Sequence, residues 1–260
     1  MNGEPSGDDV REAWDAMASF WDEQMEAGNT WQRGLIQPSV ERLLGLRSGE
    51  RVLEIACGNG EFSRRMAEVG AEVIATDFSE AMLERARARG GDIRYLLVDG
   101  TDERALAALG SPGSFDAIVC NMAIMDMREI DPMASAAAGL VGPGGRFVFS
   151  TTHPAFNGND VARVVEQTED DSGVVRRYSV KVSGYITPVT GKGVALEGQP
   201  VTQWYFHRPI SVIFEVFFRH GWVLDGLEEP VLPIERVPDG STNRIFSELP
   251  GVLVARMRRP

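Results

Sequence analysis

The sequence has few cysteines, no long apolar run and comparatively little positive charge. Its two cysteines, Cys57 and Cys120, lie in apolar segments, which favours core thiols of a reducing compartment over a disulfide or a metal pair. No apolar stretch approaches the roughly 18 residues that a membrane span requires, and the acidic first residues contain no apolar signal region. We therefore expect a cytoplasmic protein that has neither a membrane span nor a metal site.

The charge balance restricts the partners. The 260 residues include 26 lysines and arginines against 38 aspartates and glutamates, which gives a formal net charge of −12. Such a surface repels phosphate backbones, so we expect a small-molecule substrate rather than nucleic acid. The length suits one large domain, or one domain with an insertion.

The most informative segment is 51–77. It contains a short apolar strand over 52–56, a Gly-rich turn over 58–60, an amphipathic helix, and a second apolar strand over 73–76 that leads into Asp77. Glycines let the backbone approach a ligand closely, and the helix offers free N–H groups to it. A carboxylate at the tip of the second strand can accept hydrogen bonds from both hydroxyls of a ribose. This pattern predicts half of an open α/β nucleotide-binding sheet.

Three residues of this segment separate the candidate cofactors. A dinucleotide site has the pattern G-x-G-x-x-G/A, whereas the third small position here is Ser63, and Glu61 would face a pyrophosphate at the helix N-terminus. Glu54, in the first strand, suits a cationic ligand or can hold the Gly-rich loop by hydrogen bonds. S-adenosylmethionine has a ribose, an ammonium and a sulfonium but no phosphate. The residues therefore favour it over a nicotinamide dinucleotide.

Five segments, in order over roughly 110 residues, resemble the motifs of class I S-adenosylmethionine-dependent methyltransferases. They are E-x-A-C-G-x-G at 54–60, Asp77-Phe78-Ser79, Y-L-L-V-D-G at 95–100, S-F-D-A-I-V-C-N-M at 114–122 and G-P-G-G-R-F-V-F at 142–149. Ala56 departs from the pattern, because many members carry a first glycine there. The segments 152–154 and 205–209 resemble a bacterial subgroup that acts on small molecules.

The resemblance implies an S-adenosylmethionine site that is distributed over strand ends. Asp77 would bind the ribose and Asp99 the adenine amino group, while helices near the N-terminus would cover the cofactor. In that cover, Arg33 would meet a carboxylate of the substrate or cofactor. The residues expected to contact the cofactor are Trp31, Arg33, Glu54, Ala56, Cys57, Gly58, Asn59, Gly60, Asp77, Phe78, Met82, Asp99, Gly100, Asn121 and Met122.

The chain divides into four parts. Residues 1–49 hold two helices, over 8–27 and 37–45, that cover the cofactor site, and residues 50–152 form the cofactor-binding α/β core. The strands of that core are expected near 51–56, 72–76, 93–98, 115–120 and 145–151. Two helix starts are predicted from capping residues, one at Ser79 and one at Asp131 before Pro132.

The remaining residues complete the sheet. Residues 153–206 are an insertion with strands over 174–182 and 201–206, which we interpret as a small antiparallel lid, with a homodimer contact as the alternative. Residues 207–260 supply a helix over 210–220 and two final strands that pair as an antiparallel hairpin. The expected fold class is α/β: a Rossmann-like, doubly wound, seven-stranded sheet that is mostly parallel, with an antiparallel last strand.

Methyl transfer requires mainly alignment in a water-poor pocket, and a general base helps when the acceptor is a hydroxyl or a protonated amine. His153, directly after the fifth strand, is the first candidate, followed by His207 and then Asp126. Each has a structural alternative, such as a histidine that only hydrogen-bonds a loop, and in that case proximity alone carries the reaction.

The leading functional expectation is S-adenosylmethionine-dependent methyl transfer to an O or N atom of a small molecule. Two alternatives remain open from the sequence. One is an enzyme of the same fold that uses the cofactor for non-methylating chemistry. The other is a regulator that binds the cofactor without turnover.

Overall fold

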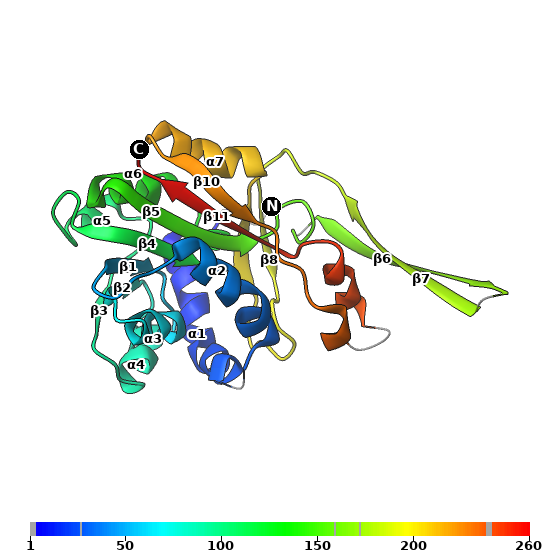
Figure 1. The fold of residues 1–260 in the computed structure, drawn as a ribbon. Coiled ribbons are helices and arrows are strands. Elements are labelled where there is room, and N and C mark those ends of the chain that lie inside the picture. The colour runs from blue at the N-terminus through cyan, green and yellow to red at the C-terminus, as the bar shows by residue number, and fades with distance from the viewer. Residues whose placement is uncertain (1–3, 27, 159, 172, 238–240) are drawn as a thin grey trace.

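A seven-stranded sheet forms the centre of the protein (Figure 1). The computed structural model describes residues 4–26, 28–158, 160–171, 173–237 and 241–260. The strand order is β10-β11-β5-β4-β1-β2-β3; β11 is antiparallel to both neighbours and the other pairs are parallel. The strands are β1 (Arg51–Ile55), β2 (Glu72–Asp77), β3 (Ile93–Leu97), β4 (Phe115–Asn121), β5 (Val141–Thr152), β10 (Val223–Glu228) and β11 (Val252–Arg258). The predicted fold class is confirmed.

Helices cover both faces of this sheet. Phe147 and Phe149 of β5 point to one face, where they pack with Phe217 of α7 and the alanine-rich α6. Val148, between them, points to the other face and packs among side chains of α2, α3 and α4. The helices are α1 (Gly7–Glu26), α2 (Gln37–Leu44), α3 (Glu61–Glu68), α4 (Glu80–Ala88), α5 (Glu103–Ala107), α6 (Asp131–Leu140) and α7 (Ile210–Arg219), with a π-helical turn η1 (Gln32–Ile36) and 3-10 turns η2 (Ile234–Arg236) and η3 (Thr242–Ser247).

Of the two N-cap residues predicted from the sequence, Ser79 is confirmed and Asp131 is wrong. Ser79 caps α4, since its side chain accepts a hydrogen bond from the Met82 N–H at 3.1 Å. Asp131 does not cap α6: Ile130 holds the N-cap position, and Asp131 and Pro132 are the first helical residues. The Asp131 carboxylate instead lies 3.1 Å from His220 Nε2 at the end of α7, so an interhelical contact takes the place of the cap.

The C-terminal part follows the predicted order. The β-branched and aromatic segment after Pro209 forms helix α7, which buries Ile213, Phe214 and Phe217 against the sheet. The final strands pair antiparallel, with β11 placed between β5 and β10. Strand β5 begins earlier than predicted, at Val141, because this residue already pairs with Phe115 of β4; the register then shifts, and continuous pairing with β4 starts at Arg146.

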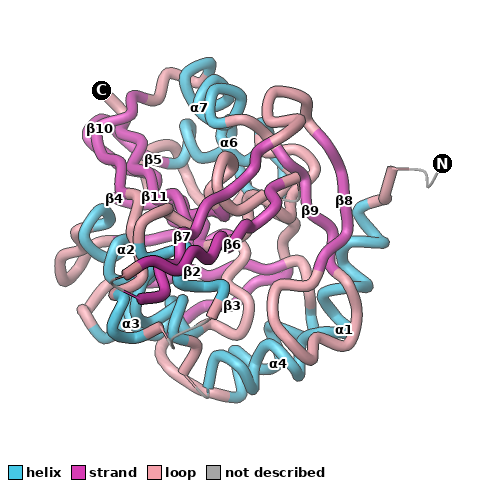
Figure 2. The backbone as a smooth tube through the Cα atoms, turned by 90° about the vertical axis from the view of Figure 1, so that its right-hand side faces the viewer, coloured by secondary structure: helices cyan, strands magenta, loops and turns pink. Residues whose placement is uncertain are grey.

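The insertion 153–206 is not a single lid, and that prediction is wrong in its architecture. It forms two separate antiparallel hairpins, β6–β7 (Val161–Asp170 and Gly173–Val182) and β8–β9 (Val189–Gly193 and Gln203–His207). The predicted strands over 174–182 and 201–206 thus belong to different sheets. Hairpin β6–β7 extends away from the main body (Figure 1), whereas β8–β9 lies beside α1 (Figure 2).

Candidate active site

A cavity of about 1100 Å³ lies beyond the carboxyl ends of the parallel strands. Single small-molecule sites usually occupy about 300–1,000 Å³, so this cavity has room for two ligands side by side. Its floor comes from the ends of β1, β2, β3 and β4, and its walls come from α1, the loop between β4 and α6, and hairpin β8–β9. Ligands of open α/β sheets bind at this edge.

Glu54, near the end of β1, is a buried carboxyl group on the cavity floor. The Ser63 hydroxyl donates a hydrogen bond to Glu54 Oε2. Burial, opposed in part by that bond and reinforced by the Asp77 carboxylate, raises the pKa of Glu54 to about 8. A ligand that brings a positive charge to Glu54 would reverse this shift, because an opposite charge favours the ionised form.

The Gly-rich loop after β1 has a left-handed backbone at three positions. Gly58 (φ 55°) and Gly60 (φ 71°) adopt this conformation, and so does Ala56 (φ 58°), a residue type that rarely does. A Cβ on Gly58 would meet nothing within 4 Å, so its backbone is open to the cavity. A Cβ on Gly60 would collide with the hydroxyl of Tyr95, so this glycine permits packing against β3.

Asp77, at the tip of β2, closes this loop. Its Oδ2 accepts the Gly58 N–H at 2.8 Å, and its Oδ1 accepts the Ser79 N–H at 2.9 Å. Burial raises the pKa of Asp77 to about 6, against the effect of these backbone hydrogen bonds. Within the described residues, no lysine, arginine or histidine forms an ion pair with Asp77 or Glu54. These two carboxyl groups therefore suit a ligand whose hydroxyl and ammonium groups donate hydrogen bonds to them.

Two further strand ends complete the floor. After β3, Asp99 Oδ1 accepts hydrogen bonds from the backbone N–H and the hydroxyl of Thr101, both at 2.7 Å. At the end of β4, Asn121 Oδ1 accepts the Ser150 hydroxyl at 2.6 Å, and Met122 has a left-handed backbone with φ 54°. Strain of this kind is concentrated at ligand sites, where the surrounding structure maintains it.

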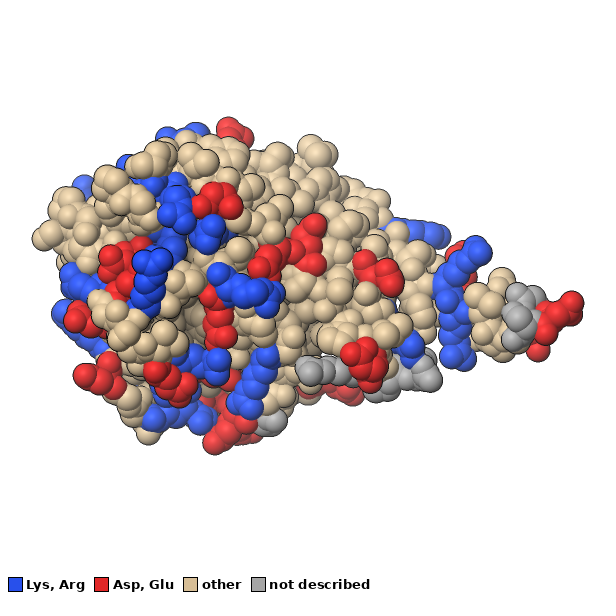
Figure 3. Space-filling view, viewed as in Figure 1, with Lys and Arg blue, Asp and Glu red and all other residues tan. Residues whose placement is uncertain are grey.

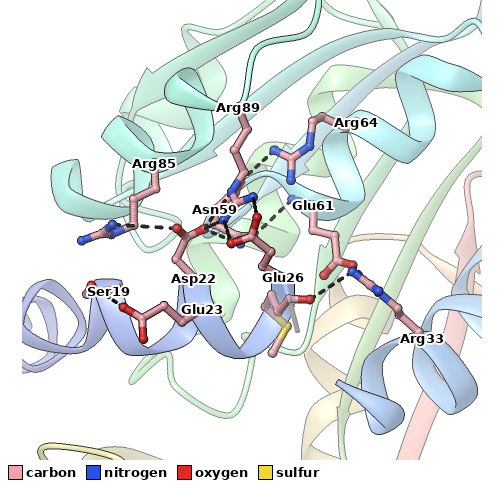
Figure 4. A network of polar contacts seen from close by, with 11 residues as sticks. Ser19, Asp22, Glu23, Glu26, Arg33, Asn59, Glu61, Arg64, Arg85 and Arg89 are labelled. Carbon is pink, nitrogen blue, oxygen red and sulfur yellow. Dashed lines mark hydrogen bonds and ion pairs between the residues drawn. The ribbon is translucent and has the colours of Figure 1, made fainter. Parts of the chain in front are cut away.

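Helix α1 is tied to the Gly-rich loop by a polar network (Figure 4). Asp22 accepts hydrogen bonds from the Asn59 side-chain amide and from Arg89 Nε of the α4 C-terminus, both at 2.9 Å. On the same helix, Trp21, which directly precedes Asp22, and Trp14, about two turns earlier, line the cavity with ring centroids 5.7 Å apart. The helix thereby covers the floor with aromatic rings while polar groups at its edge hold it in place.

Most of the residues expected at the cofactor site line this one cavity. They are Trp31, Glu54, Ala56, Cys57, Gly58, Asn59, Asp77, Phe78, Met82, Asp99, Gly100, Asn121 and Met122. Gly60 packs behind the loop, and Arg33 lies outside the lining, where its Nε contacts Glu61 at 3.1 Å (Figure 4). The expectation that Arg33 meets a ligand carboxylate therefore has no support in its position.

The three catalytic candidates differ in position. His153 is buried outside the lining: its Nδ1 accepts the Ala155 N–H at 3.2 Å, so Nε2 carries the proton and donates it to Glu229 at 2.8 Å. His207 lines the cavity, and its Nε2 lies 2.8 Å from the carbonyl oxygen of Tyr185. Asp126 also lines the cavity, and burial raises its pKa well above the usual range.

Two residues around the cavity were not among the predicted site residues, although one of them, Arg208, lies in the segment 205–209 that resembles a small-molecule subgroup. Arg208 donates to the carbonyl oxygens of Ile124 and Phe206, both at 3.2 Å, and to those of Met127 and Arg128. Gln203, at the start of β9, donates to Asp126 Oδ1 at 3.2 Å. Both come from the insertion or just after it, and the partners named here, apart from Phe206, are more than 70 residues away in the sequence. Only the fold brings them together.

A family described as a methyltransferase domain matches residues 52–145, the segment that contains all four strand ends of the cavity floor. A crystal structure of an S-adenosylmethionine-dependent methyltransferase from Mesorhizobium loti is similar at 26% identity and a TM-score of 0.66, over 85% of this chain and 96% of that one. The α/β core of residues 52–145 is therefore a domain of the class I S-adenosylmethionine-dependent methyltransferase type.

Curated relatives of this chain carry names of small-molecule enzymes. A ubiquinone biosynthesis O-methyltransferase of Bordetella bronchiseptica is 34% identical over 143 residues, which are 52% of this chain and 56% of the relative. A demethylmenaquinone methyltransferase of Renibacterium salmoninarum is 29% identical over 155 residues, 57% of this chain and 61% of the relative. The chain thus spans little more than half the length of these relatives. Among its described residues, none of the helices has the length and apolar character needed to cross a bilayer.

Proposed function

We propose that this methyltransferase transfers the methyl group of S-adenosylmethionine to an O or N atom of a small molecule. The observation that carries the proposal is the set of three carboxyl groups, Glu54, Asp77 and Asp99, at the ends of three adjacent strands on one cavity floor. When bound there, S-adenosylmethionine supplies a methyl group that its sulfonium already activates. The names of the curated relatives support a small-molecule acceptor.

In this proposal each carboxyl group has its own partner. Asp77 accepts hydrogen bonds from the ribose hydroxyls, Asp99 accepts one from the adenine amino group, and Glu54 binds the ammonium group. The open backbone at Gly58 and the apolar side chains around it, such as Met82, line the path of the ligand. The chain's contribution is to bind and orient the reactants and to exclude water from a covered cavity.

Asp126 and His207 are the candidates for the general base because both side chains line the cavity. The protonated Nε2 of His207 points to a carbonyl oxygen, which leaves Nδ1 as the nitrogen that can accept a proton. His153 has a different role in this proposal. Through its bond to Glu229 it fixes the chain after β5 to the chain after β10.

Calorimetric titration with S-adenosylmethionine and S-adenosylhomocysteine tests the shared premise. We expect both to bind, and transfer of a radiolabelled methyl group to a small-molecule acceptor then separates a methyltransferase from the two alternatives, a non-methylating enzyme and a regulator. Failure of both ligands to bind at millimolar concentration would refute the proposal.

We also propose a cytoplasmic location and no nucleic-acid partner. The two cysteines are free and buried, which suits a reducing compartment. A net charge of −12 opposes binding to phosphate backbones, and on the face in Figure 3 acidic and basic residues are interspersed over the main body.

A homodimer through hairpin β6–β7 is part of the proposal. Both edges of this two-stranded hairpin are free of further strand partners within the described residues, and open edges tend to pair. Its stem carries Arg163 and Lys181 and its tip carries Glu169 and Asp171. Figure 3 shows basic residues along this hairpin and acidic residues at its tip. In a two-fold antiparallel arrangement, the acidic tip of one hairpin lies beside the basic stem of the other.

Charge reversal tests this contact. Glu169→Lys and Lys181→Glu should each shift the wild-type dimer toward monomer in sedimentation experiments, because like charges then face one another. A mixture of the two variants should restore a dimer that contains both chains. A monomeric wild type, or single variants that dimerise as well as the wild type, would contradict the arrangement.

A further inference from the structure

The part of the cavity away from the strand ends of β1–β3 contains one buried carboxyl group, that of Asp126. It lies in the loop between β4 and α6, and its Oδ1 accepts a hydrogen bond from Gln203 Nε2 at 3.2 Å. Among the described residues, no basic side chain forms an ion pair with it. A buried carboxyl group without a counter-ion is costly unless a ligand supplies one.

The nearby arginines are committed to other groups. Arg208 donates to backbone carbonyl oxygens, and Arg128 donates to the Pro5 carbonyl at 3.0 Å and to Glu4. Arg163 lies 4.8 Å from the ring centroid of Phe246 and donates to Asn157 at 3.1 Å. None of these three guanidinium groups is bonded to Asp126, so each leaves the carboxyl group available to a ligand.

Aromatic side chains line the same cavity, and burial together with the nearby Asp126 carboxylate raises the pKa of Tyr205. Trp14 and Trp21 of α1 and Tyr205 of β9 line it, and the Trp21 Nε1–H is buried without a hydrogen-bond partner. Aromatic faces attract ammonium groups, and the attraction increases when water is excluded. The Asp126 carboxyl group and these rings together therefore form a site for a cation rather than for a neutral hydroxyl group.

We propose that Asp126, with Trp14, Trp21 and Tyr205, binds the acceptor as an ammonium ion, so that the methylated atom is a nitrogen. This inference rests on the proposed methyltransferase function and selects one of its two acceptor classes. An N–H bond of the ammonium ion breaks, the proton forms an O–H bond with an Asp126 carboxylate oxygen, and the electron pair remains on nitrogen as the nucleophile. Burial raises the pKa of Asp126 well above the usual range, and the bound ammonium ion favours the ionised form, so binding releases the proton of Asp126 and leaves a carboxylate that can accept one from the acceptor nitrogen.

Two probes of equal shape test the proposal. 2-Phenylethylamine and 2-phenylethanol are titrated calorimetrically into protein that is saturated with S-adenosylhomocysteine, so that the carboxylates of the cofactor site are occupied. We expect the amine to bind at least about tenfold more tightly than the alcohol, since hydrogen bonds to charged groups contribute about 1.5–3 kcal/mol. Asp126→Asn should remove this preference.

Glu129→Gln is the matched control, because it neutralises an exposed carboxylate three residues along the same chain segment. This variant should keep the preference for the amine. Equal binding of both probes, no binding of the amine, or a preference that survives in Asp126→Asn would overturn the proposal. Failure of S-adenosylhomocysteine to bind the wild type would refute the methyltransferase function instead, so the two failures are distinguishable.

Discussion

The two halves of the cavity are built in different ways. The cofactor half consists of strand ends and the turns directly after them, all within residues 52–145. The acceptor half consists of α1, the loop between β4 and α6, and hairpin β8–β9, which lie in three separate parts of the chain, Gly7–Glu26, 122–130 and 189–207. A sheet edge fixes the first half with local hydrogen bonds, whereas long-range side-chain contacts hold the second half together.

The two halves of the cavity should respond separately to substitutions. Polar groups in the cofactor half are bonded mainly to backbone groups of neighbouring strands and turns, such as Gly58 and Ser79 to Asp77. In the acceptor half, a few side chains join distant segments, such as Arg208 and Gln203. A single substitution there should change the acceptor site while leaving the cofactor site intact, and the reverse should also hold.

Asp77→Ala should have the largest effect on the cofactor half. Two hydrogen bonds from the ribose and two from the loop backbone would be lost, and bonds to charged acceptors contribute about 1.5–3 kcal/mol each. We expect the affinity for S-adenosylhomocysteine, measured by calorimetry, to fall at least about 100-fold. Asp77→Asn keeps the shape and one acceptor oxygen and should lose less. Wild-type affinity in Asp77→Ala would disprove the ribose assignment.

Arg208→Met should have the largest effect on the acceptor half. It removes the donor of four backbone carbonyl oxygens that lie in or beside the β4–α6 loop. We expect the free energy of unfolding to fall by about 3 kcal/mol, given the strength of bonds from charged donors. Affinity for S-adenosylhomocysteine should change less than about threefold. This corresponds to less than about 0.7 kcal/mol, since 1.4 kcal/mol corresponds to a factor of ten.

Scanning calorimetry and ligand titration on the same samples check the Arg208 prediction. Arg208→Lys is the control: it keeps the charge but can reach fewer of the carbonyl oxygens, so its stability should be intermediate. A loss of cofactor affinity as large as the loss of stability would show that the two halves are coupled rather than independent.

The same difference explains what the sequence could predict. The shared position of Glu54, Asp77 and Asp99 was predictable because each lies at or just after the end of a predicted strand, and parallel strands bring their ends to one edge. The single lid was wrong because it depended on how separate segments meet in space, and a ligand contact of Arg33, which depends on the same, stays a prediction. Asp126 and His207 were identified as candidates, yet their partners Gln203 and Tyr185 carry no sequence signal.

The raised pKa of Glu54 predicts a pH dependence of stability, an effect of intermediate size. In the unfolded chain this carboxyl group ionises near its ordinary value, whereas the folded protein keeps it protonated to about pH 8. The unfolded state therefore binds fewer protons between about pH 5 and about pH 8, and stability should fall by up to about 1.4 kcal/mol per pH unit as pH rises through that range. In Glu54→Gln this slope, measured from melting temperatures, should be smaller.

Ligand binding should also depend on the ionisation of Glu54. An ammonium beside Glu54 favours its ionised form, so binding of S-adenosylhomocysteine near pH 7 should release up to about one proton and become tighter as pH rises toward 8. Calorimetry in buffers of different ionisation enthalpy counts the protons. If Glu54→Gln releases as many protons as the wild type, the ammonium does not bind there.

The smallest expected effect concerns the strained turn of the cofactor half. Ala56 has φ 58°, a conformation that costs an L-residue about 1–2 kcal/mol relative to glycine. Ala56→Gly should therefore raise the free energy of unfolding by about 1 kcal/mol, because relief of this strain outweighs the greater freedom of glycine in the unfolded chain. Gly58→Ala is the matched control: its φ is 55° and a Cβ would meet no neighbour within 4 Å, so backbone strain alone should destabilise it by a similar amount. Chemical denaturation measures both changes. Because the strain is confined to one turn, binding of the amine probe in the acceptor half should be the same in both variants, and a change there would mean that the turn and the acceptor half are coupled.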